Sequence, residues 1–382
     1  MVWWMRNTKT HQNKKPVTRP RIKIATYSIS LNEEKHIKRW LEATKESDYR
    51  VVFDTGSTDK TVELLKAAGV TIEVGIISPW RFDHARNRAL DLIPEDADVC
   101  LILDMDEVPE KNFYKKVRKQ WVLGADRGWI QIDTGFKWRV DRLHSRHNWK
   151  WKWPCHEVAM WQLEREYVFC ETNAYITHQP DNEKSRGQYL TMLQEACDGE
   201  FAQDARMWTY LTREYYFKGN WKKVIESAEK AITFDGWDVE LAAICRWAGD
   251  ASKNLHVDPT DWFDRGVSLC PQEGEPWLAV ASQAFRGHKW QKGLDAAIQV
   301  IETPKMNHYL HDPSAWEWKA YDLAAGCAYN LGYLDEAITF GREALKGKGP
   351  ESERIKRNLV FMEGLKNNAT LTQTQSNRLG NE

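Results

Sequence analysis

The sequence predicts an α/β domain with a doubly wound, mostly parallel sheet, followed by an all-α domain of helical repeats. Apolar runs of strand length alternate with amphipathic helical patterns up to about residue 103. From residue 184 onward, aromatic and small residues recur at the offsets of helix-pair repeats. A chain of 382 residues also exceeds what one hydrophobic core organises comfortably, so two domains are expected.

Strands and helices alternate in the first part of the chain. The predicted strands are residues 22–27, 50–53, 70–74 and 99–103, and the predicted helices begin near Asn32, Thr61 and Phe82. Each strand is a continuous apolar run, which is typical of a strand buried on both faces. Ile37, Trp40 and Leu41 fall on one face of the first helix.

Three carboxylates follow the fourth predicted strand within four positions. Asp104, Asp106 and Glu107 repel one another unless a cation joins them. Open α/β sheets bind ligands beyond the carboxyl ends of their strands. Alternate residues Asp104 and Asp106 can therefore turn toward one Mn²⁺ or Mg²⁺, which prefers oxygen ligands. A solvated turn after a core strand is the alternative interpretation of this pair.

Asp54 closes the second predicted strand, and Gly56 permits a tight turn after it. Because parallel strands end at the same edge of a sheet, Asp54 is expected on one rim with Asp104 and Asp106. A nucleotide would bind at that rim. The sequence contains neither Gly-x-Gly-x-x-Gly nor Gly-Lys-Ser/Thr, so neither a dinucleotide-binding fold nor a P-loop is supported.

Four motifs in series carry a family resemblance. They are Asn32-Glu33-Glu34, the run from Asp54 to Thr61, Phe82-x-x-Ala85-Arg86-Asn87 and Leu103-Asp104-Met105-Asp106-Glu107. In order and spacing this series resembles family 2 glycosyltransferases of the GT-A fold. It looks closest to bacterial and phage-type members that end in tetratricopeptide-like helices, a group that includes peptide S-glycosyltransferases. The resemblance spans roughly residues 20–350 and implies a UDP-sugar donor with Mn²⁺ or Mg²⁺.

The resemblance also implies roles for individual residues. The nucleotide-binding set is Asn32, Glu33, Asp54, Arg86, Asn87 and Asp104. Asp54 is expected to hydrogen-bond the uracil or the ribose. Of the Asp-x-Asp pair, Asp104 is expected to lie nearer the ribose, and Asp106 is the surer metal ligand. For Arg86 and Asn87 the structural alternative is that one of them ties its helix to the sheet.

Residues 137–153 interleave cations with aromatic side chains. Such a stretch can neutralise a diphosphate, stack on a sugar or bind a nucleic acid. The alternative is a β-hairpin with a solvated basic face and a packed tryptophan face. Alternation of Trp149, Trp151 and Trp153 is the pattern that such a strand would show.

Two histidines after this stretch are further candidate site residues. His156-Glu157 does not belong to a zincin motif, because position 160 is Met160. The resembling family has a His-Glu pair near the acceptor, so Glu157 is our first candidate for the catalytic base and His156 the second. A pair that only braces the hairpin is the alternative. His178 resembles a closing histidine that reaches the metal, although Gln179-Pro180 replaces the usual Gly-aromatic pair.

These patterns predict four regions: a flexible basic leader (1–20), a GT-A catalytic domain (21–183), a tetratricopeptide-like domain (184–365) and a disordered polar tail (366–382). The helical repeats are expected to serve as a platform for acceptor recognition or for a homodimer.

Bulk composition narrows the function. With 54 basic and 55 acidic residues, the chain has no overall attraction to nucleic acid or membrane. Seven scattered cysteines without Cys-x-x-Cys, no signal peptide and no apolar run of membrane length predict a cytoplasmic protein.

The leading hypothesis is a metal-dependent inverting glycosyltransferase that uses a UDP-sugar. Its acceptor stays open between a peptide, a glycan and a modified nucleic-acid base. The alternatives are a nucleotidyltransferase and a non-catalytic helical-repeat scaffold with a vestigial sheet domain.

Overall fold

The computed structural model describes residues 21–133, 137–179, 187–305, 308 and 310–379, so the expected leader lies outside the described residues. The chain divides into two compact units. The sheet unit contains described residues 21–77, 85–151 and 159–179, and the helical unit contains 78–84, 152–158 and the residues from 187 on. The expected boundary near residue 183 therefore misses two segments of the helical unit. Trp80, Phe82 and Trp153 explain them, because these side chains pack in the helical core.

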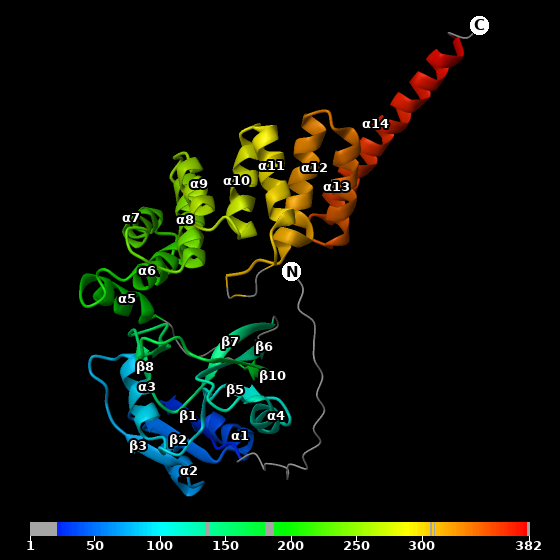
Figure 1. Cartoon of the computed structure of the whole chain (residues 1–382). Helices are drawn as coiled ribbons and strands as arrows, with labels where there is room; N and C mark the ends of the chain where they lie inside the picture. Colours follow the sequence, from blue (N-terminus) through cyan, green and yellow to red (C-terminus); the bar gives the residue numbers. More distant parts are fainter. Residues whose placement is uncertain (1–20, 134–136, 180–186, 306–307, 309, 380–382) are drawn as a thin grey trace, which may run out of the picture. The chain divides into compact units, whose positions relative to one another are not determined.

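The sheet unit is built on eight strands in the order β3-β2-β1-β4-β7-β6-β10-β5 (Figure 1). In chain order these strands are β1 Ile24–Ser30, β2 Tyr49–Asp54, β3 Thr71–Val74, β4 Val99–Ile102, β5 Glu107–Pro109, β6 Arg127–Asp133, β7 Lys137–His144 and β10 Phe169–His178. Strands β3, β2, β1 and β4 are parallel, as expected. Strand β7 is antiparallel to β4 and β6, and β5 is antiparallel to β10. The expectation of a mostly parallel sheet thus holds for the first four strands, and the second half is mixed.

Helices cover both faces of the parallel half. These helices are α1 Glu34–Ala43, α2 Thr61–Ala67, α3 Phe82–Asp91, which belongs to the sheet unit from Ala85 on, and α4 Phe113–Gln120. Trp40 of α1, Leu65 of α2 and Val117 of α4 share one core cluster with Val52 of β2. Because side chains alternate along a strand, Phe53 points to the opposite face. There Arg88 of α3 lies over the Phe53 ring, 6.0 Å from its centroid.

Strands β8 Trp149–Lys152 and β9 Val158–Trp161 form a separate two-stranded sheet. Trp149, Trp151 and Trp153 are all buried, whereas Lys150 and Lys152 are exposed. Our structural alternative for the stretch 137–153, a hairpin with a packed tryptophan face and a solvated basic face, therefore holds for strand β8, whereas residues 137–144 form β7 of the large sheet and Trp153 packs in the helical core. These tryptophans are not available as a stacking surface for bases.

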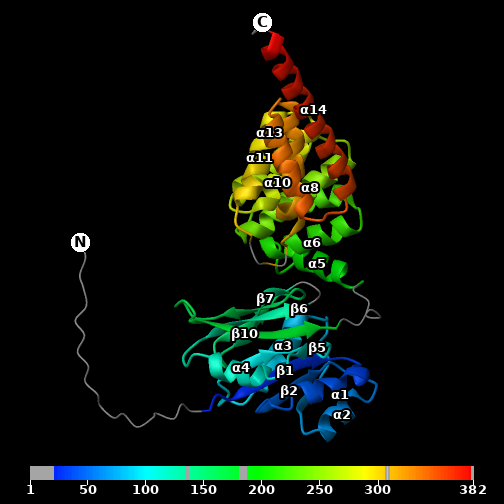
Figure 2. The ribbon, with the colours of Figure 1, turned by 90° about the vertical axis from the view of Figure 1, so that its right-hand side faces the viewer.

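The helical unit consists of consecutive helix pairs (Figure 1), and Figure 2 shows the same helices from another side. Its helices are α5 Tyr189–Asp198, α6 Ala205–Phe217, α7 Trp221–Ala231, α8 Asp238–Asn254, α9 Thr260–Leu269, α10 Gly274–Arg286, α11 Trp290–Glu302, the π-helix η1 Ala315–Lys319, α12 Ala320–Asn330, α13 Leu334–Lys346 and α14 Ser352–Leu379. Gly219, between α6 and α7, and Gly332, between α12 and α13, have φ angles of 66° and 85°, which favour glycine. Helix α14 runs through residues 366–379, where a disordered tail was expected. Among the described residues, no helix combines the length and the apolar character needed to cross a membrane.

Candidate active site

The ends of three parallel strands define the edge on which the site is built. Ser30 of β1 is in register with Asp54 of β2, and Tyr27 of β1 is in register with Ile102 of β4. All three strands run in the same direction, so their carboxyl ends lie at one edge of the sheet. Asp54 and Asp104 are therefore on the same edge, as the sequence predicted.

Asp54 is fully buried and organises its own turn. Its carboxylate accepts hydrogen bonds from the hydroxyls of Ser30 and Ser57 at 2.6 Å each, and from the backbone N–H groups of Ser57 at 2.8 Å and Gly56 at 3.1 Å. We expected Asp54 to bind the uracil or ribose of a nucleotide. The structure instead uses both carboxylate oxygens within the protein, so Asp54 stabilises the turn that borders the site.

Asn32 and Glu33 connect the end of β1 to the loop after β2. The side-chain oxygen of Asn32, a residue with a φ of 53°, accepts a hydrogen bond from the backbone N–H of Thr58 at 2.8 Å. The backbone N–H of Glu33, a buried residue, donates to the Thr61 hydroxyl at 2.7 Å. Both residues thus position the two loops relative to each other.

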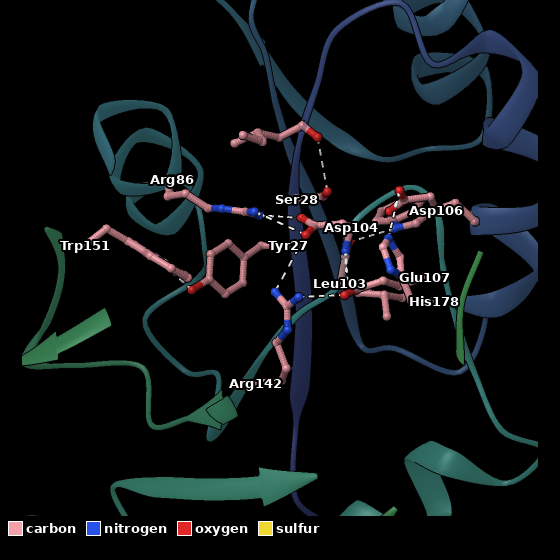
Figure 3. Close-up of polar contacts among 12 residues, drawn as sticks. Tyr27, Ser28, Arg86, Leu103, Asp104, Asp106, Glu107, Arg142, Trp151 and His178 are labelled. Atoms are coloured by element: carbon pink, nitrogen blue, oxygen red, sulfur yellow. Dashed lines mark hydrogen bonds and ion pairs between the residues drawn. The ribbon is translucent and has the colours of Figure 1, made fainter. Parts of the chain in front are cut away.

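Two arginines surround Asp104 (Figure 3). Arg86 of α3 donates to both oxygens of Asp104, at 2.6 and 3.2 Å. Arg142 of β7 donates to Glu107 at 2.6 Å, and its other terminal nitrogen lies 3.7 Å from Asp104. The second oxygen of Glu107 accepts from the backbone N–H of Asp104 at 2.9 Å. The sequence singled out Arg86 by its motif, but it marked Arg142 only as one of the cations in residues 137–153.

Charge and burial act in opposite directions on these two acids. Burial alone raises the pKa of Asp104, but the positive charges of Arg86 and Arg142 outweigh it and hold that pKa well below its usual range. For Glu107, burial dominates and, with repulsion from Asp104 and Asp106, raises the pKa to about 7 despite the attraction of Arg142. Asp104 is therefore an ionised partner of the arginines at neutral pH.

Asp106 and His178 form the other half of the site (Figure 3). Asp106 Oδ2 lies 3.2 Å from His178 Nε2, and about a quarter of each side chain is exposed (22% and 26%). The hydrogen bond to Asp106 raises the pKa of His178. A carboxylate beside an imidazole suits Mn²⁺, and a carboxylate suits Mg²⁺.

Only two of the three predicted metal ligands are placed to bind a cation. Asp106 and His178 fit, whereas both oxygens of Asp104 accept hydrogen bonds from Arg86. The described part of the chain contains no group of three or more His, Cys, Asp or Glu side chains placed to hold a metal ion. A cation at Asp106 and His178 would therefore need further oxygens from substrate or water.

Asn87 ties helix α3 to strand β8. Its side-chain amide donates to the Trp151 carbonyl at 3.0 Å, and its oxygen accepts from the Trp151 N–H at 2.8 Å. The Trp151 indole in turn donates to the Tyr27 hydroxyl at 3.1 Å. This is the structural role that we left open as an alternative for this helix.

His156 and Glu157 belong to the helical unit. The His156 ring stacks on Tyr210 of α6, with ring centroids 3.8 Å apart, and its Nε2 lies 3.2 Å from Arg213 Nη2. Arg206 donates to the His156 carbonyl at 3.2 Å. His156 is therefore built into the face of α6, a structural role that differs from the bracing of the hairpin considered above. Glu157 is half-buried.

Comparison with known proteins gives no functional assignment. No family model matches the sequence, and no curated protein matches it. Among solved structures, the chain is similar to MamA (16% identity, 44% of this chain and 93% of MamA, TM-score 0.35). It is also similar to YrrB, a TPR protein with an unusual peptide-binding site (14%, 47% and 81%, TM-score 0.33), and to the APC/C hetero-tetramer Cut9–Hcn1 (10%, 47% and 33%, TM-score 0.36). Similarities at these TM-scores carry no argument about what this chain does.

Proposed function

We propose that the protein is a metal-dependent glycosyltransferase that moves a sugar from a UDP-sugar to a nucleophilic acceptor. The observation that carries the proposal is the Asp106–His178 pair, which lies next to Asp104 beyond the carboxyl ends of the parallel strands. The four motifs that resemble GT-A family 2 glycosyltransferases support the same function. Inversion at the anomeric carbon follows from that resemblance by analogy.

Each residue of the site then has a defined task. Asp106 and His178 would hold Mn²⁺ or Mg²⁺, which supplies charge stabilisation to the departing diphosphate when bound. Asp54, Asn32 and Glu33 fix the loops that border the nucleotide. Glu157 would take the proton of the acceptor, because His156 Nε2 already faces a guanidinium that can only donate.

The acceptor class follows less directly from the residues. The burial of Trp149, Trp151 and Trp153 removes the main argument for stacking on nucleic-acid bases, which leaves a peptide or a glycan as the better candidates. The helical unit offers them a surface: a hollow of about 440 Å³ there is lined by Lys253, Lys289 and Lys292 among other residues. We assign acceptor recognition to this unit.

A donor panel tests the proposal. The full-length protein is incubated with individual UDP-sugars in Mn²⁺, in Mg²⁺ or in EDTA, and free UDP is measured. We expect metal-dependent UDP release that is lost in Asp106→Ala. A nucleotidyltransferase would release pyrophosphate from a nucleoside triphosphate instead. A scaffold would release neither product, and UDP would not raise its melting temperature.

A further inference from the structure

Two guanidinium groups converge on the Asp104 side chain from different elements (Figure 3). Arg86 comes from helix α3 and Arg142 from strand β7, so neither depends on the other for its position. The Arg86 side chain is only 7% exposed and that of Arg142 is 20% exposed, whereas Asp104 is 29% exposed. The carboxylate is thus the member of this group that solvent reaches most easily.

Glu107 holds Arg142 independently of Asp104. The Glu107 side chain is 2% exposed and accepts from both Arg142 and the backbone N–H of Asp104. If the Asp104 side chain turned away, Arg142 would keep its buried partner at 2.6 Å. Arg86 would keep its contact with the Trp151 ring, whose centroid lies 5.3 Å from the guanidinium carbon. Both cations would then present donors to whatever anion replaced the carboxylate.

We infer that Asp104 holds the place of the diphosphate, and that Arg142 together with Arg86 binds the diphosphate of the nucleotide when Asp104 gives way. The inference rests on the proposed function. A guanidinium fork matches phosphate oxygens as well as it matches a carboxylate, and phosphate oxygens are strong acceptors. A diphosphate carries more negative charge than the single carboxylate that it displaces. Arg142 is the new assignment, because the sequence marked it only as one of several cations in residues 137–153.

Binding measurements without metal test this role. Titration calorimetry in EDTA compares uridine, UMP and UDP as ligands of the wild-type protein and of Arg142→Ala. We expect UDP affinity to fall by roughly tenfold to hundredfold, the size of a lost hydrogen bond to a charged group, with uridine affinity unchanged. Arg142→Lys should recover part of the loss, since it keeps the charge but not the fork. Arg139→Ala, on the same strand but paired with the exposed Glu171, is the matched control and should bind UDP as the wild type does.

Further variants separate binding from folding. Removing Arg142 leaves the Glu107 carboxylate buried without its cation, which can destabilise the fold. The double variant Arg142→Ala/Glu107→Gln avoids this buried charge. It should show the same selective loss of UDP affinity. Asp104→Asn should tighten metal-free UDP binding severalfold, because it removes the competing charge. If Arg142→Ala weakened uridine and UDP equally, or neither, the inference would be wrong while the proposed function stood. If the wild-type protein bound neither ligand in EDTA, the inference would be overturned, and the same titration in Mn²⁺ would then test the proposed function, which would fall only if UDP did not bind there either.

Discussion

Nε2 of His156 lies 3.2 Å from Nη2 of Arg213. This contact distinguishes His156 from Glu157, the two candidate bases between which the sequence did not decide. A guanidinium has donors only, so Nε2 must be the acceptor and the imidazole carries its proton on Nδ1. The ring is also stacked on Tyr210. His156 is therefore a structural side chain held against α6, and Glu157 stays our proposed base.

Glu157→Gln and His156→Gln should consequently behave differently in transfer assays. We expect Glu157→Gln to lower the turnover rate by about 10²-fold or more, as the loss of a general base does, with little change in donor KM. His156→Gln should lower the melting temperature and change turnover much less. Steady-state kinetics and thermal unfolding of both variants check this. A His156→Gln variant that folds normally and loses turnover as completely as Glu157→Gln would reverse the assignment.

The Asp106–His178 pair predicts how metal affects stability. A nucleotide that binds only the folded state at a hundredfold excess over its Kd stabilises a protein by about 2.7 kcal/mol. We therefore expect UDP with Mn²⁺ to raise the melting temperature more than UDP with EDTA, and Asp106→Asn and His178→Ala to remove the metal-dependent part. Asp91→Asn, at an exposed acid in helix α3, is the control. An undiminished Mn²⁺ effect in Asp106→Asn would exclude this pair as the cation site.

The parallel half of the fold could be predicted because its signals are local. Apolar runs alternate with helical periods, and each strand lies within three residues of its predicted bounds; β2, for example, covers Tyr49–Asp54 where 50–53 was expected. The mixed half depends on pairings between distant segments. β10 pairs with β6 and with β5, and no short-range pattern in the sequence specifies these partners.

The sequence predicted where the candidate site lies, but it did not predict which side chains form hydrogen bonds with one another there. A carboxylate at a strand end can face a ligand or cap its own turn, and Asp54 caps because Ser30 and Ser57 supply hydroxyls. The Ser30 contact crosses 24 positions of sequence. Arg142 was missed for the same reason, since its partner Glu107 is 35 positions away. The only sequence signal for Arg142 was the excess of cations in residues 137–153.

A buried histidine predicts loss of stability in acid. Burial lowers the pKa of His144 to about 4, and its Nε2 accepts a hydrogen bond from the Tyr27 hydroxyl at 2.8 Å. In the unfolded chain a histidine titrates near 6.5. Between pH 4 and pH 6.5 the folded state therefore binds fewer protons than the unfolded chain. The contribution of neutral His144 to the free energy of unfolding is complete above pH 6.5 and is lost as the pH falls toward 4. The expected slope is about 1.4 kcal/mol per pH unit at most.

Urea unfolding of the wild type and His144→Gln between pH 4 and 7 measures this contribution as the difference between the two curves. The comparison of the two proteins is needed because Glu107, whose pKa is raised, affects stability with the opposite sign. Its contribution to the free energy of unfolding is present below pH 4.5 and is lost as the pH rises toward 7. We expect the stability gap between the two proteins to narrow as the pH is lowered. A gap that stayed constant would show that His144 does not titrate differently on folding.

Gly249 predicts how tightly the helix pairs of the helical unit pack. A Cβ atom on this residue of α8 would lie 2.7 Å from Cδ1 of Phe263 on α9, a ring that is itself buried. Gly249→Ala should therefore destabilise the protein by about 1–3 kcal/mol through overpacking, although alanine favours a helix by about 1 kcal/mol over glycine. Gly364→Ala on α14 is the matched control, because a Cβ there meets no atom within 4 Å, and it should leave stability unchanged or raise it. Adding Phe263→Leu to Gly249→Ala should recover part of the loss by relieving the clash. Equal unfolding midpoints for Gly249→Ala and Gly364→Ala would mean that α8 and α9 are not in close contact at this position.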